Sequence, residues 1–401
     1  MSVRYENARV EISGHGRLRV SLRVVNDSTL HWRGAALGWQ VTERESHRYL
    51  EDGPSVELHG TLAPGESREC AIEGALPAFA GYYRLFVSPL TPDLGWLHTS
   101  GARAIVVDVD VDGDGAALLQ KGCWSIAELA RRDLTSAPRE MLAAVWANRG
   151  LAWTLARRDL AARFRGSLGD ALWTVLHPLL LMLTYLFVFG VVLRARFAGD
   201  PSTAGFALYF LAGMVPWLAF SETVGRAPSA LVEHRHFVKK LVFPVELLNV
   251  VHTLAALATQ MVGLALLCAL IFVLRGGVPA MALLLPVFLA PQVLLTLALS
   301  WTLSALGVYL RDLGQIIGFL LTLLFFLTPI CYPEQSLPPG LDVYFRKNPF
   351  YVIVGGWRAV LLQGPMPTLR SILLLYAVSI AAVYASALLY RKLRPTFADV
   401  L

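Results

Sequence analysis

Apolar and polar residues alternate in several short segments of the first 115 residues. In RLRVSLRVV, residues 17–25, every second position is Leu or Val, and ARAIVVDVDV, residues 102–111, ends in the same period. Such alternation is typical of strands with one buried face. Turn-forming triplets separate these segments, among them Asn26-Asp27-Ser28, Asp52-Gly53-Pro54 and Pro64-Gly65-Glu66. Short strands with frequent turns predict an all-β sandwich over residues 1–115.

The pattern changes after VDGDGAALLQKG, residues 111–122, whose Gly and Asp residues mark a domain boundary. We expect a linker with polar helices over residues 116–150. In residues 151–168, apolar side chains recur at steps of three and four: Trp153, Ala156, Leu160 and Phe164. A helix with one apolar face and surrounding arginines lies along a membrane surface. The residues predicted to meet this interface are Arg158, Arg163, Phe164 and Arg165.

Six long apolar segments follow, each of about 19 to 28 residues, which is enough to cross about 30 Å of hydrocarbon. They cover approximately residues 171–193, 206–224, 247–274, 281–308, 314–332 and 369–390. The intervening segment 333–364 is too interrupted by Pro and Gly to span, and such backbone must be covered by protein at membrane depth. The pattern predicts an all-α polytopic membrane domain over residues 151–395, with six transmembrane helices.

Composition supports two domains in different solvents. The chain is 55% hydrophobic and only 16% charged, with a mean hydropathy of +0.54, which excludes a single water-soluble globule. Residues 1–120 contain 11 Arg and no Lys against 16 acidic residues, a net charge of −5, whereas residues 121–401 have a net charge of +11. The basic residues lie beside apolar spans, so they indicate lipid headgroups rather than nucleic acid as their partner.

Charge also predicts the topology. The first residues, MSVRYENARVEIS, lack the apolar core of a signal peptide, so we expect the sandwich to stay in the cytosol. Six spans then place both termini in the cytoplasm of a plasma (inner) membrane protein. With this orientation the inner loops carry 12 Lys and Arg against six in the outer loops, as the positive-inside rule requires.

The residues that could support chemistry are few. The four cysteines are far apart, which favours reduced thiols over disulfides or zinc ligands. His234 and His236 project from different sides of a helix, so no metal site is predicted there. The chain has no GxxxxGK[ST] loop to bind ATP phosphates. No carboxylate or His cluster at a membrane face suggests acid–base catalysis, so we expect no enzyme activity and no cofactor in this chain.

The membrane segments resemble the permease subunits of type 2 ABC exporters of polysaccharides such as O-antigen, capsule or teichoic acid. The matching runs include RRDLAARFRGSLGDALWTVLHPLL, FALYFLAGMVPWLAFSETV, ALVEHRHFVKKLVFPVELL and VYLRDLGQIIGFLLTLLFFLTPICYP, in family order. Asp170, near a position where the family tends to have Gly, and His177-Pro178, in place of Asn-Pro, depart from the family pattern. The resemblance implies a homodimer that moves a lipid-linked polysaccharide from the cytosol across the inner membrane, and an external re-entrant hairpin over 333–364.

The same resemblance implies a separate ABC ATPase in two copies, which binds ATP and Mg. The family's coupling helix corresponds to residues 226–243, part of the charged stretch between the second and third spans. The residues implied to contact the ATPase are Glu233, Arg235, His236, Lys239 and Lys240. The alternative is that these charges only keep a loop in water.

Aromatic side chains are suited to a glycan path, because they stack on the CH faces of sugars. Candidates within the spans are Tyr185, Phe189, Tyr209, Trp217, Phe325, Phe326 and Tyr332. Each could instead face lipid or belong to an interfacial aromatic belt. Glu222, an ionisable residue within the second span, is expected to face protein or water.

VVNDSTLHWRG, PAFAGYYRLFVSPL and GWLHTSG resemble the immunoglobulin-like sandwiches attached to polysaccharide exporters and to some glycosyltransferases. That resemblance implies a carbohydrate-binding role, with Trp32, Trp39, Tyr82 and Trp96 as candidate platforms; the alternative is that they fill the core. Here the sandwich is fused to the membrane domain rather than to the ATPase. Two further functions stay open: a type 2 ABC permease for drugs or small lipids, and a membrane-bound glycan-modifying enzyme.

Overall fold

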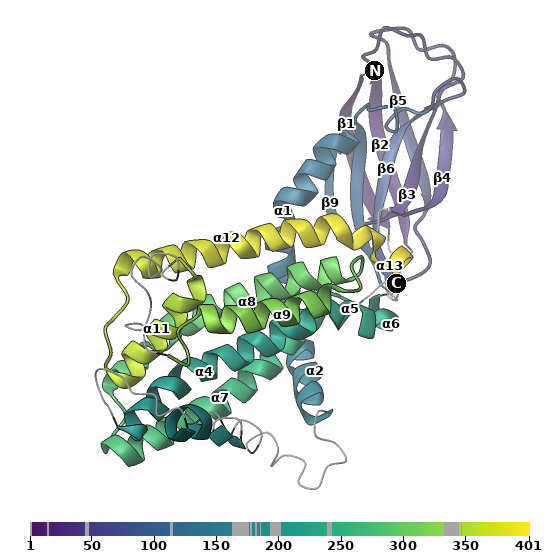
Figure 1. Ribbon diagram of the computed structural model, residues 1–401. Coiled ribbons are helices and arrows are strands. Elements are labelled where there is room, and N and C mark those ends of the chain that lie inside the picture. Colours follow the sequence, from purple (N-terminus) through teal and green to yellow (C-terminus); the bar gives the residue numbers. More distant parts are fainter. Residues whose placement is uncertain are drawn as a thin grey trace. The chain divides into compact units, whose positions relative to one another are not determined.

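The structure is a computed structural model. It describes residues 2–13, 16–44, 48–112, 115–162, 202–238, 243–332 and 347–401, together with residues 176, 179–180, 183–184, 186–192 and 345. The chain divides into two compact units. The strands, the first half of helix α1, to Ala137, and also Phe243 and residues 391–399 belong to one unit. Residues 138–238, 244–390 and 400–401 belong to the other (Figure 1).

The first unit contains two antiparallel sheets. One has the strand order β1-β2-β5, and the other has the order β4-β3-β6-β8-β9, with β7 paired to β6. The strands are β1 (Val3–Ser13), β2 (Arg17–Asn26), β3 (Ala36–Glu43), β4 (Tyr49–Glu57), β5 (Ser67–Ala75), β6 (Gly81–Thr91), β7 (Gly95–Trp96), β8 (Ala104–Val111) and β9 (Ala116–Trp124).

The two sheets share one apolar core. Leu18, Val20 and Val24 of β2 are completely buried, as are Val107 and Val109 of β8. Residues of both sheets belong to this single cluster. The alternation in the sequence therefore does mark the inward faces of the strands, and the predicted all-β fold is confirmed.

The sheet extends beyond the predicted end of the sandwich. β9 pairs with β8 along its whole length, although residues 116–124 were placed in a linker. Asp112 and Gly115 lie between these strands, and the Asp112 side chain accepts a hydrogen bond from the Gly115 backbone at 2.8 Å. The composition signal thus marked a turn inside the domain.

Helix α1 (Ile126–Ala147) begins directly after β9. Ser125 and Glu128 cap its first turn reciprocally: the Ser125 backbone donates to Glu128, and the Glu128 backbone donates to the Ser125 hydroxyl. Asp133 then reaches the outer face of the larger sheet. It pairs with Arg84 of β6, which also forms two hydrogen bonds to Asp108 of β8 at 2.7 and 3.0 Å.

The second unit is helical. Its elements are α2 (Arg149–Ala162), η2 (Leu186–Val192), α4 (Thr203–Arg226), η3 (Ala227–Ser229), α5 (Ala230–Glu233), α6 (Arg235–Val238), α7 (Leu247–Arg275), η4 (Ala280–Leu284), α8 (Pro286–Gly307), α9 (Leu313–Leu327), α11 (Pro349–Leu362) and α12 (Leu369–Leu393). Short helices η6 (Arg394–Thr396) and α13 (Phe397–Val400) end the chain.

Four helical stretches are long and apolar enough to cross a membrane: Ala204–Glu233, Leu247–Arg275, Ala280–Gly307 and Leu369–Thr396. They match the second, third, fourth and sixth predicted spans. Nearly half of the first predicted span lies outside the described residues, and η2 (Leu186–Val192) covers its last part. At the fifth, α9 has 15 residues, shorter than the predicted segment 314–332. The helical membrane domain is confirmed in this coarser form, and six spans stay a prediction.

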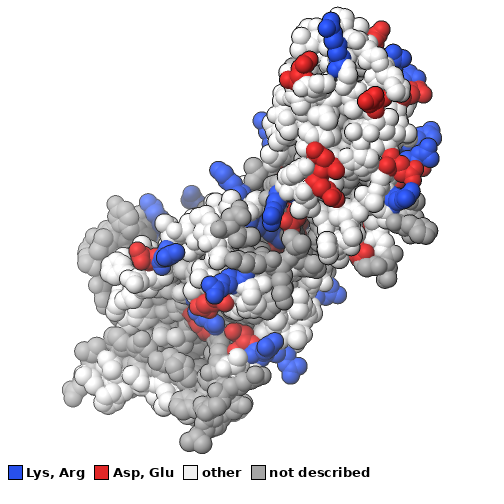
Figure 2. Space-filling view, turned by 90° about the vertical axis from the view of Figure 1, so that its right-hand side faces the viewer, with Lys and Arg blue, Asp and Glu red and all other residues white. Residues whose placement is uncertain are grey.

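Helix α4 forms the centre of this unit. In its most apolar window 78% of residues are buried, against 22%, 39% and 28% in the other three long stretches. Those three therefore keep wide apolar surfaces for lipid or for another protein chain. In Figure 2 much of the described surface of the helical unit lacks charged side chains, whereas the sandwich carries charges of both signs.

Candidate functional site

The segment predicted to be the coupling helix is divided into η3, α5 and α6 in its described residues. At His234 the backbone leaves the helical region, with φ −109° and ψ 27°. A ring nitrogen of His234 lies 3.0 Å from the carbonyl oxygen of Ala230, which would accept the His234 backbone N–H in a continuous helix. In its described residues the segment is therefore not one continuous helix, and its coupling role stays a prediction. Lys239 and Lys240, which follow α6, lie outside the described residues.

Close packing holds the beginning of this segment. A Cβ atom on Gly307 of α8 would lie 2.0 Å from the carbonyl oxygen of Pro228, so only glycine allows η3 this close to α8. Glu233 accepts a hydrogen bond of 2.6 Å from the Ser229 hydroxyl. Arg235 and His236 are exposed. Of the predicted contact residues that the structure describes, Glu233, Arg235 and His236 are thus all accessible.

The same segment lines a pocket of about 550 Å³. Val232 and Arg235 form part of one wall, and Tyr309 and Arg311, in the loop between α8 and α9, form part of another. Val232 and Tyr309 are 44% and 39% exposed, so the surface combines apolar and basic groups. Such a surface is suited to an acidic and partly apolar partner.

Ionic and aromatic contacts connect this region to α2 and α7. Arg226, at the end of α4, pairs with Asp159 of α2 at 3.4 Å. The ring of His234 lies 5.8 Å from that of His252 on α7. In α2, Ala152 and Ala156 are buried, whereas Trp153 is 57% exposed and Arg158 is also exposed. The remaining interface residues Arg163, Phe164 and Arg165 lie outside the described residues.

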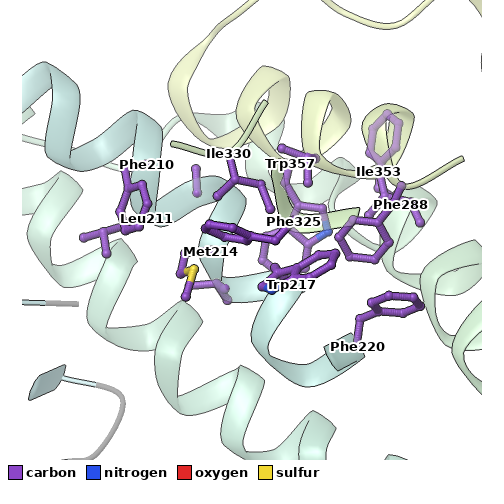
Figure 3. Packing of buried hydrophobic residues seen from close by; sticks show 14 of the residues in the cluster. Phe210, Leu211, Met214, Trp217, Phe220, Phe288, Phe325, Ile330, Ile353 and Trp357 are labelled. Carbon is purple, nitrogen blue, oxygen red and sulfur yellow. The ribbon is translucent and has the colours of Figure 1, made fainter. Parts of the chain in front are cut away.

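Two candidate path aromatics lie inside the helical core. Trp217 of α4 is 5% exposed, and its ring centroid is 5.6 Å from that of Phe325 (Figure 3). The ring of Phe350 lies 5.3 Å from that of Trp217. Phe325 is 9% exposed. In this conformation both rings stabilise the packing of α4, α9 and α11 instead of lining an open passage. Phe326, in contrast, is 53% exposed.

The other path candidates differ in their surroundings. The Tyr332 hydroxyl donates to the Phe326 carbonyl oxygen at 2.6 Å, which fixes the ring at the end of α9. Tyr185 lies outside the described residues. Phe189 lies in η2, where its side chain is not described. A glycan path through these positions stays a prediction.

Arg358 of α11 is a buried charge that sequence reasoning missed. It is one of the six Lys and Arg residues predicted for the outer loops, yet it is 5% exposed. Its guanidinium donates to the carbonyl oxygens of Tyr209, Pro329 and Ile330 at 3.1, 2.7 and 3.0 Å. It also lies 3.4 Å from the centre of the Tyr209 ring, so one face of this candidate platform is covered. The charge joins the predicted hairpin to α4 and to the end of α9.

Buried amides form a second feature that was not predicted. Gln260 of α7 and Gln292 of α8 exchange hydrogen bonds of 3.0 and 3.3 Å, and Gln292 also donates to the Pro216 carbonyl oxygen in α4. Asn249 bonds to Ser300 and Ser304 in the same way between α7 and α8. Polar amides within apolar spans were the signal that could have identified these contacts.

In the sandwich, the four candidate glycan platforms separate into two groups. Trp32 and Trp39 are 2% and 0% exposed, so they fill the core and cannot stack on a ligand; for them the prediction was wrong. Gly53 leaves room for the Trp39 indole, since a Cβ there would lie 2.0 Å from its nitrogen. Tyr82 is 39% exposed, and Trp96 is partly buried on the outer face of the larger sheet.

Comparison with known proteins assigns the helical unit. The profile of the ABC-2 type transporter family matches residues 150–362, more than half of the chain. The chain belongs to the ABC-2 type transporter family. It is therefore an integral membrane transporter component rather than an enzyme. Among the described residues, no group of three or more His, Cys, Asp or Glu could hold a metal ion.

Curated relatives carry transport names. The chain is similar to the O-antigen export system permease protein RfbA of Myxococcus xanthus, with 32% identity over 253 residues, which cover 63% of this chain and 95% of the relative. A protein of the same name from Klebsiella pneumoniae is 26% identical over 254 residues, 62% of this chain and 93% of its own length. The polysialic acid transport protein KpsM of Escherichia coli is 24% identical over 237 residues, 58% and 90% of the two chains.

Proposed function

We propose that this ABC-2 transporter chain is the permease of an ATP-driven exporter that moves a lipid-linked, O-antigen-like polysaccharide from the cytosol across the inner membrane. The observation that carries the proposal is the 95% coverage of a named O-antigen export permease at 32% identity. The relatives named here act on polysaccharides, which favours this function over export of drugs or small lipids and over glycan modification.

The energy source in this proposal is a separate ABC ATPase, present in two copies and binding ATP with Mg. Its contact surface is the exposed part of α5 and α6, with Glu233, Arg235 and His236, extended by Lys239 and Lys240. The close packing of this segment supports a role in coupling. Gly307 allows Pro228 to pack directly against α8, and the ion pair Arg226–Asp159 connects α4 to α2. Because the segment is tightly packed, a displacement caused by the ATPase would move the neighbouring helices as well.

The proposed topology has both termini in the cytoplasm and two copies of this chain around the substrate. Wide apolar surfaces on α7, α8 and α12 are compatible with lipid and with a second copy. In the proposed cycle the aromatic cluster around Trp217 opens when the ATPase acts. Candidate rings along the path are then Tyr185, Phe189, Tyr209, Trp217, Phe325, Phe326 and Tyr332.

Gene deletion in the host tests the function. We expect the deletion strain to lose polymer at the cell surface and to accumulate lipid-linked polysaccharide in the cytosol, and the wild-type gene to restore export. Normal surface polysaccharide in the deletion strain would contradict the proposal. A changed drug sensitivity with unchanged surface polymer would favour the small-molecule alternative.

A further inference from the structure

One part of the larger sheet's outer face combines polar and aromatic groups. Strand register places Asp52 of β4, Gln40 of β3 and Phe86 of β6 in one row across the sheet. Side chains of one row point to the same face. Their neighbours Trp39 and Val41 fill the core, so the row of Gln40 points away from it.

The polar members of this row are already oriented. The Gln40 side-chain amide donates to one carboxylate oxygen of Asp52 at 2.8 Å. This bond leaves the amide oxygen and one amide N–H of Gln40 for a ligand. Tyr49, opposite Thr42 on the same face, is 52% exposed. Partial desolvation, a hydrogen bond to the Asp52 side chain and the charges of Asp52 and Glu51 raise the pKa of the Tyr49 phenol, so the hydroxyl is protonated at neutral pH and is held beside Asp52.

An aromatic group bounds the row at its other end. Phe86 and His98 stack with their ring centroids 5.2 Å apart and their planes at 4°, and Trp96 lies 5.8 Å from His98. Trp96 also lies against Gly38, where a Cβ atom would be 2.9 Å from the indole. The indole is therefore held in place before any ligand arrives, which lowers the entropic cost of stacking on it.

The dimensions suit a short segment of a linear polymer. Thr42, opposite Tyr49, and Gly38, beneath Trp96, are four residues apart on β3, which corresponds to about 13 Å along a strand. Gln40 and Asp52 lie between these two aromatic ends. On β6 and β8, α1 covers the same face, because Asp133 pairs with the buried Arg84. We name the uncovered surface, formed by Tyr49, Gln40, Asp52 and Trp96, the β3–β4 strip.

Electrostatics select among polymers. Glu51 and Asp52 lie close to Tyr49, and burial together with Glu43 and Glu51 raises the pKa of the neighbouring Tyr83. Two basic residues lie at this end of β3: Arg44, which pairs with Asp108 at 3.1 Å, and Arg48, which is exposed next to Tyr49. Residues 1–120 have a net charge of −5. A polymer with carboxylates or phosphates would be repelled here, whereas hydroxyl groups find oriented donors and acceptors.

We propose that the β3–β4 strip binds an uncharged segment of the exported polysaccharide, with a sugar ring on Trp96 and hydroxyl groups on Gln40, Asp52 and Tyr49. This inference rests on the proposed function and adds the site and the charge class of its substrate. Gln40, Asp52 and Tyr49 were not among the residues singled out from the sequence.

Calorimetric titration of the full chain in lipid nanodiscs tests the proposal. The probe is the O-polysaccharide released from the host's own lipopolysaccharide, and polysialic acid serves as the anionic comparison. We expect saturable binding of the first and none of the second. Trp96→Ala, and separately the pair Gln40→Ala and Asp52→Ala, should each weaken binding by about tenfold or more, as loss of stacking or of hydrogen bonds predicts.

The matched control is Phe79→Ala. Phe79 is 79% exposed and lies outside the strip, so its variant should bind as the wild type does. Unchanged affinity in both strip variants, equal binding of polysialic acid, or no binding of the released polysaccharide would overturn the proposal. So would loss of the co-purified ATPase in the strip variants, since it would identify a protein-docking surface.

Export in cells separates this inference from the proposed function. If the wild-type chain exports polysaccharide and the strip fails the binding test, only the strip is refuted. If a deletion strain keeps its surface polysaccharide, the proposed function fails whatever the binding result. The Gln40 and Asp52 variants alter exposed or partly exposed groups, so their thermal unfolding should match that of the wild type and keep the comparison valid.

Discussion

His98 is a residue of the sandwich whose ionisation depends on folding between about pH 4 and pH 7. Its ring is 3% exposed, and burial lowers its pKa to about 4, an effect that nearby Asp52 opposes only in part. An unfolded chain binds a proton on this ring below about pH 6.5, but the folded chain does not. The stability that neutral His98 contributes is therefore complete above about pH 6.5 and is lost as the pH falls toward 4.

We expect acidification from pH 7 to pH 4.5 to destabilise the sandwich by on the order of 2 kcal/mol through this group. His98→Phe keeps a ring against Phe86 and removes the titration, so its stability should depend less on pH in this range. Thermal unfolding of residues 1–137 at several pH values measures the difference. Parallel pH curves for the two proteins would show that His98 does not contribute.

Arg358 should not be replaceable by lysine. Three carbonyl oxygens in different directions accept hydrogen bonds from its Nε and from both terminal nitrogens. A single ammonium group cannot reproduce this planar arrangement. We expect Arg358→Lys to lower the stability of the helical unit by about 2 kcal/mol, because buried carbonyl groups lose their donors. Arg275→Lys is the control, since Arg275 is exposed and donates once, to Leu362. Equal melting temperatures in detergent would contradict the assignment.

At the scale of elements, the first half of α1 belongs to the sandwich. Arg84 is 1% exposed and bonds to Asp108 and to Asp133 of α1. A fragment that ends at residue 115 loses β9 and Asp133, whereas a fragment of residues 1–137 keeps both. Removing one partner from a buried ion pair costs about 3–5 kcal/mol. We therefore expect residues 1–137 to unfold cooperatively and residues 1–115 to melt far lower or to aggregate.

Within the longer fragment, Asp133→Ala should produce a large part of this loss. Glu73→Ala is its control, because the Arg17–Glu73 pair is 3.6 Å long and both side chains are at least half exposed. Exposed pairs contribute about 0–1 kcal/mol. If circular dichroism melting gave the same midpoint for the two fragments, α1 would have to be regarded as a linker.

Periodicity predicted those elements whose burial has a regular period. The alternation at Leu18, Val20 and Leu22 identified β2, and long apolar runs identified α4, α7, α8 and α12. Features that depend on contacts between distant segments were not predictable in this way. From the sequence, Arg358 is expected to be an exposed loop charge. Its three acceptors lie in α4 and after the end of α9, so only the folded structure shows that it is buried.

The same limit applied to the candidate sites. Trp39 and Trp96 are indistinguishable by residue type, yet strand register directs one into the core and leaves the other on the outer face. The charges in the sequence located the coupling segment, but they did not predict that its helix is interrupted at His234. At this interruption the His234 ring contacts a carbonyl oxygen, and such a contact cannot be predicted from the spacing of hydrophobic residues.

At the scale of the whole molecule, the chain combines a sandwich with a family transporter unit, and the proposed exporter requires an ATPase that this chain does not provide. The contact should depend on charge, because Arg235 is exposed beside a pocket that also contains Arg311. Lys239 and Lys240 follow in the sequence, so the segment offers a basic surface to an acidic partner.

Reversing these charges in Arg235→Glu, Lys239→Glu and Lys240→Glu should separate assembly from folding. Arg235 is exposed and forms no ion pair among the described residues, so we expect normal insertion and expression. Like charges placed opposite each other at an interface cost several kcal/mol, so the ATPase should no longer co-purify and export should stop. Arg370→Glu, an exposed reversal at the start of α12, is the matched control and should retain the ATPase. Full ATPase retention and full export in the triple variant would mean that these charges only keep the segment in water.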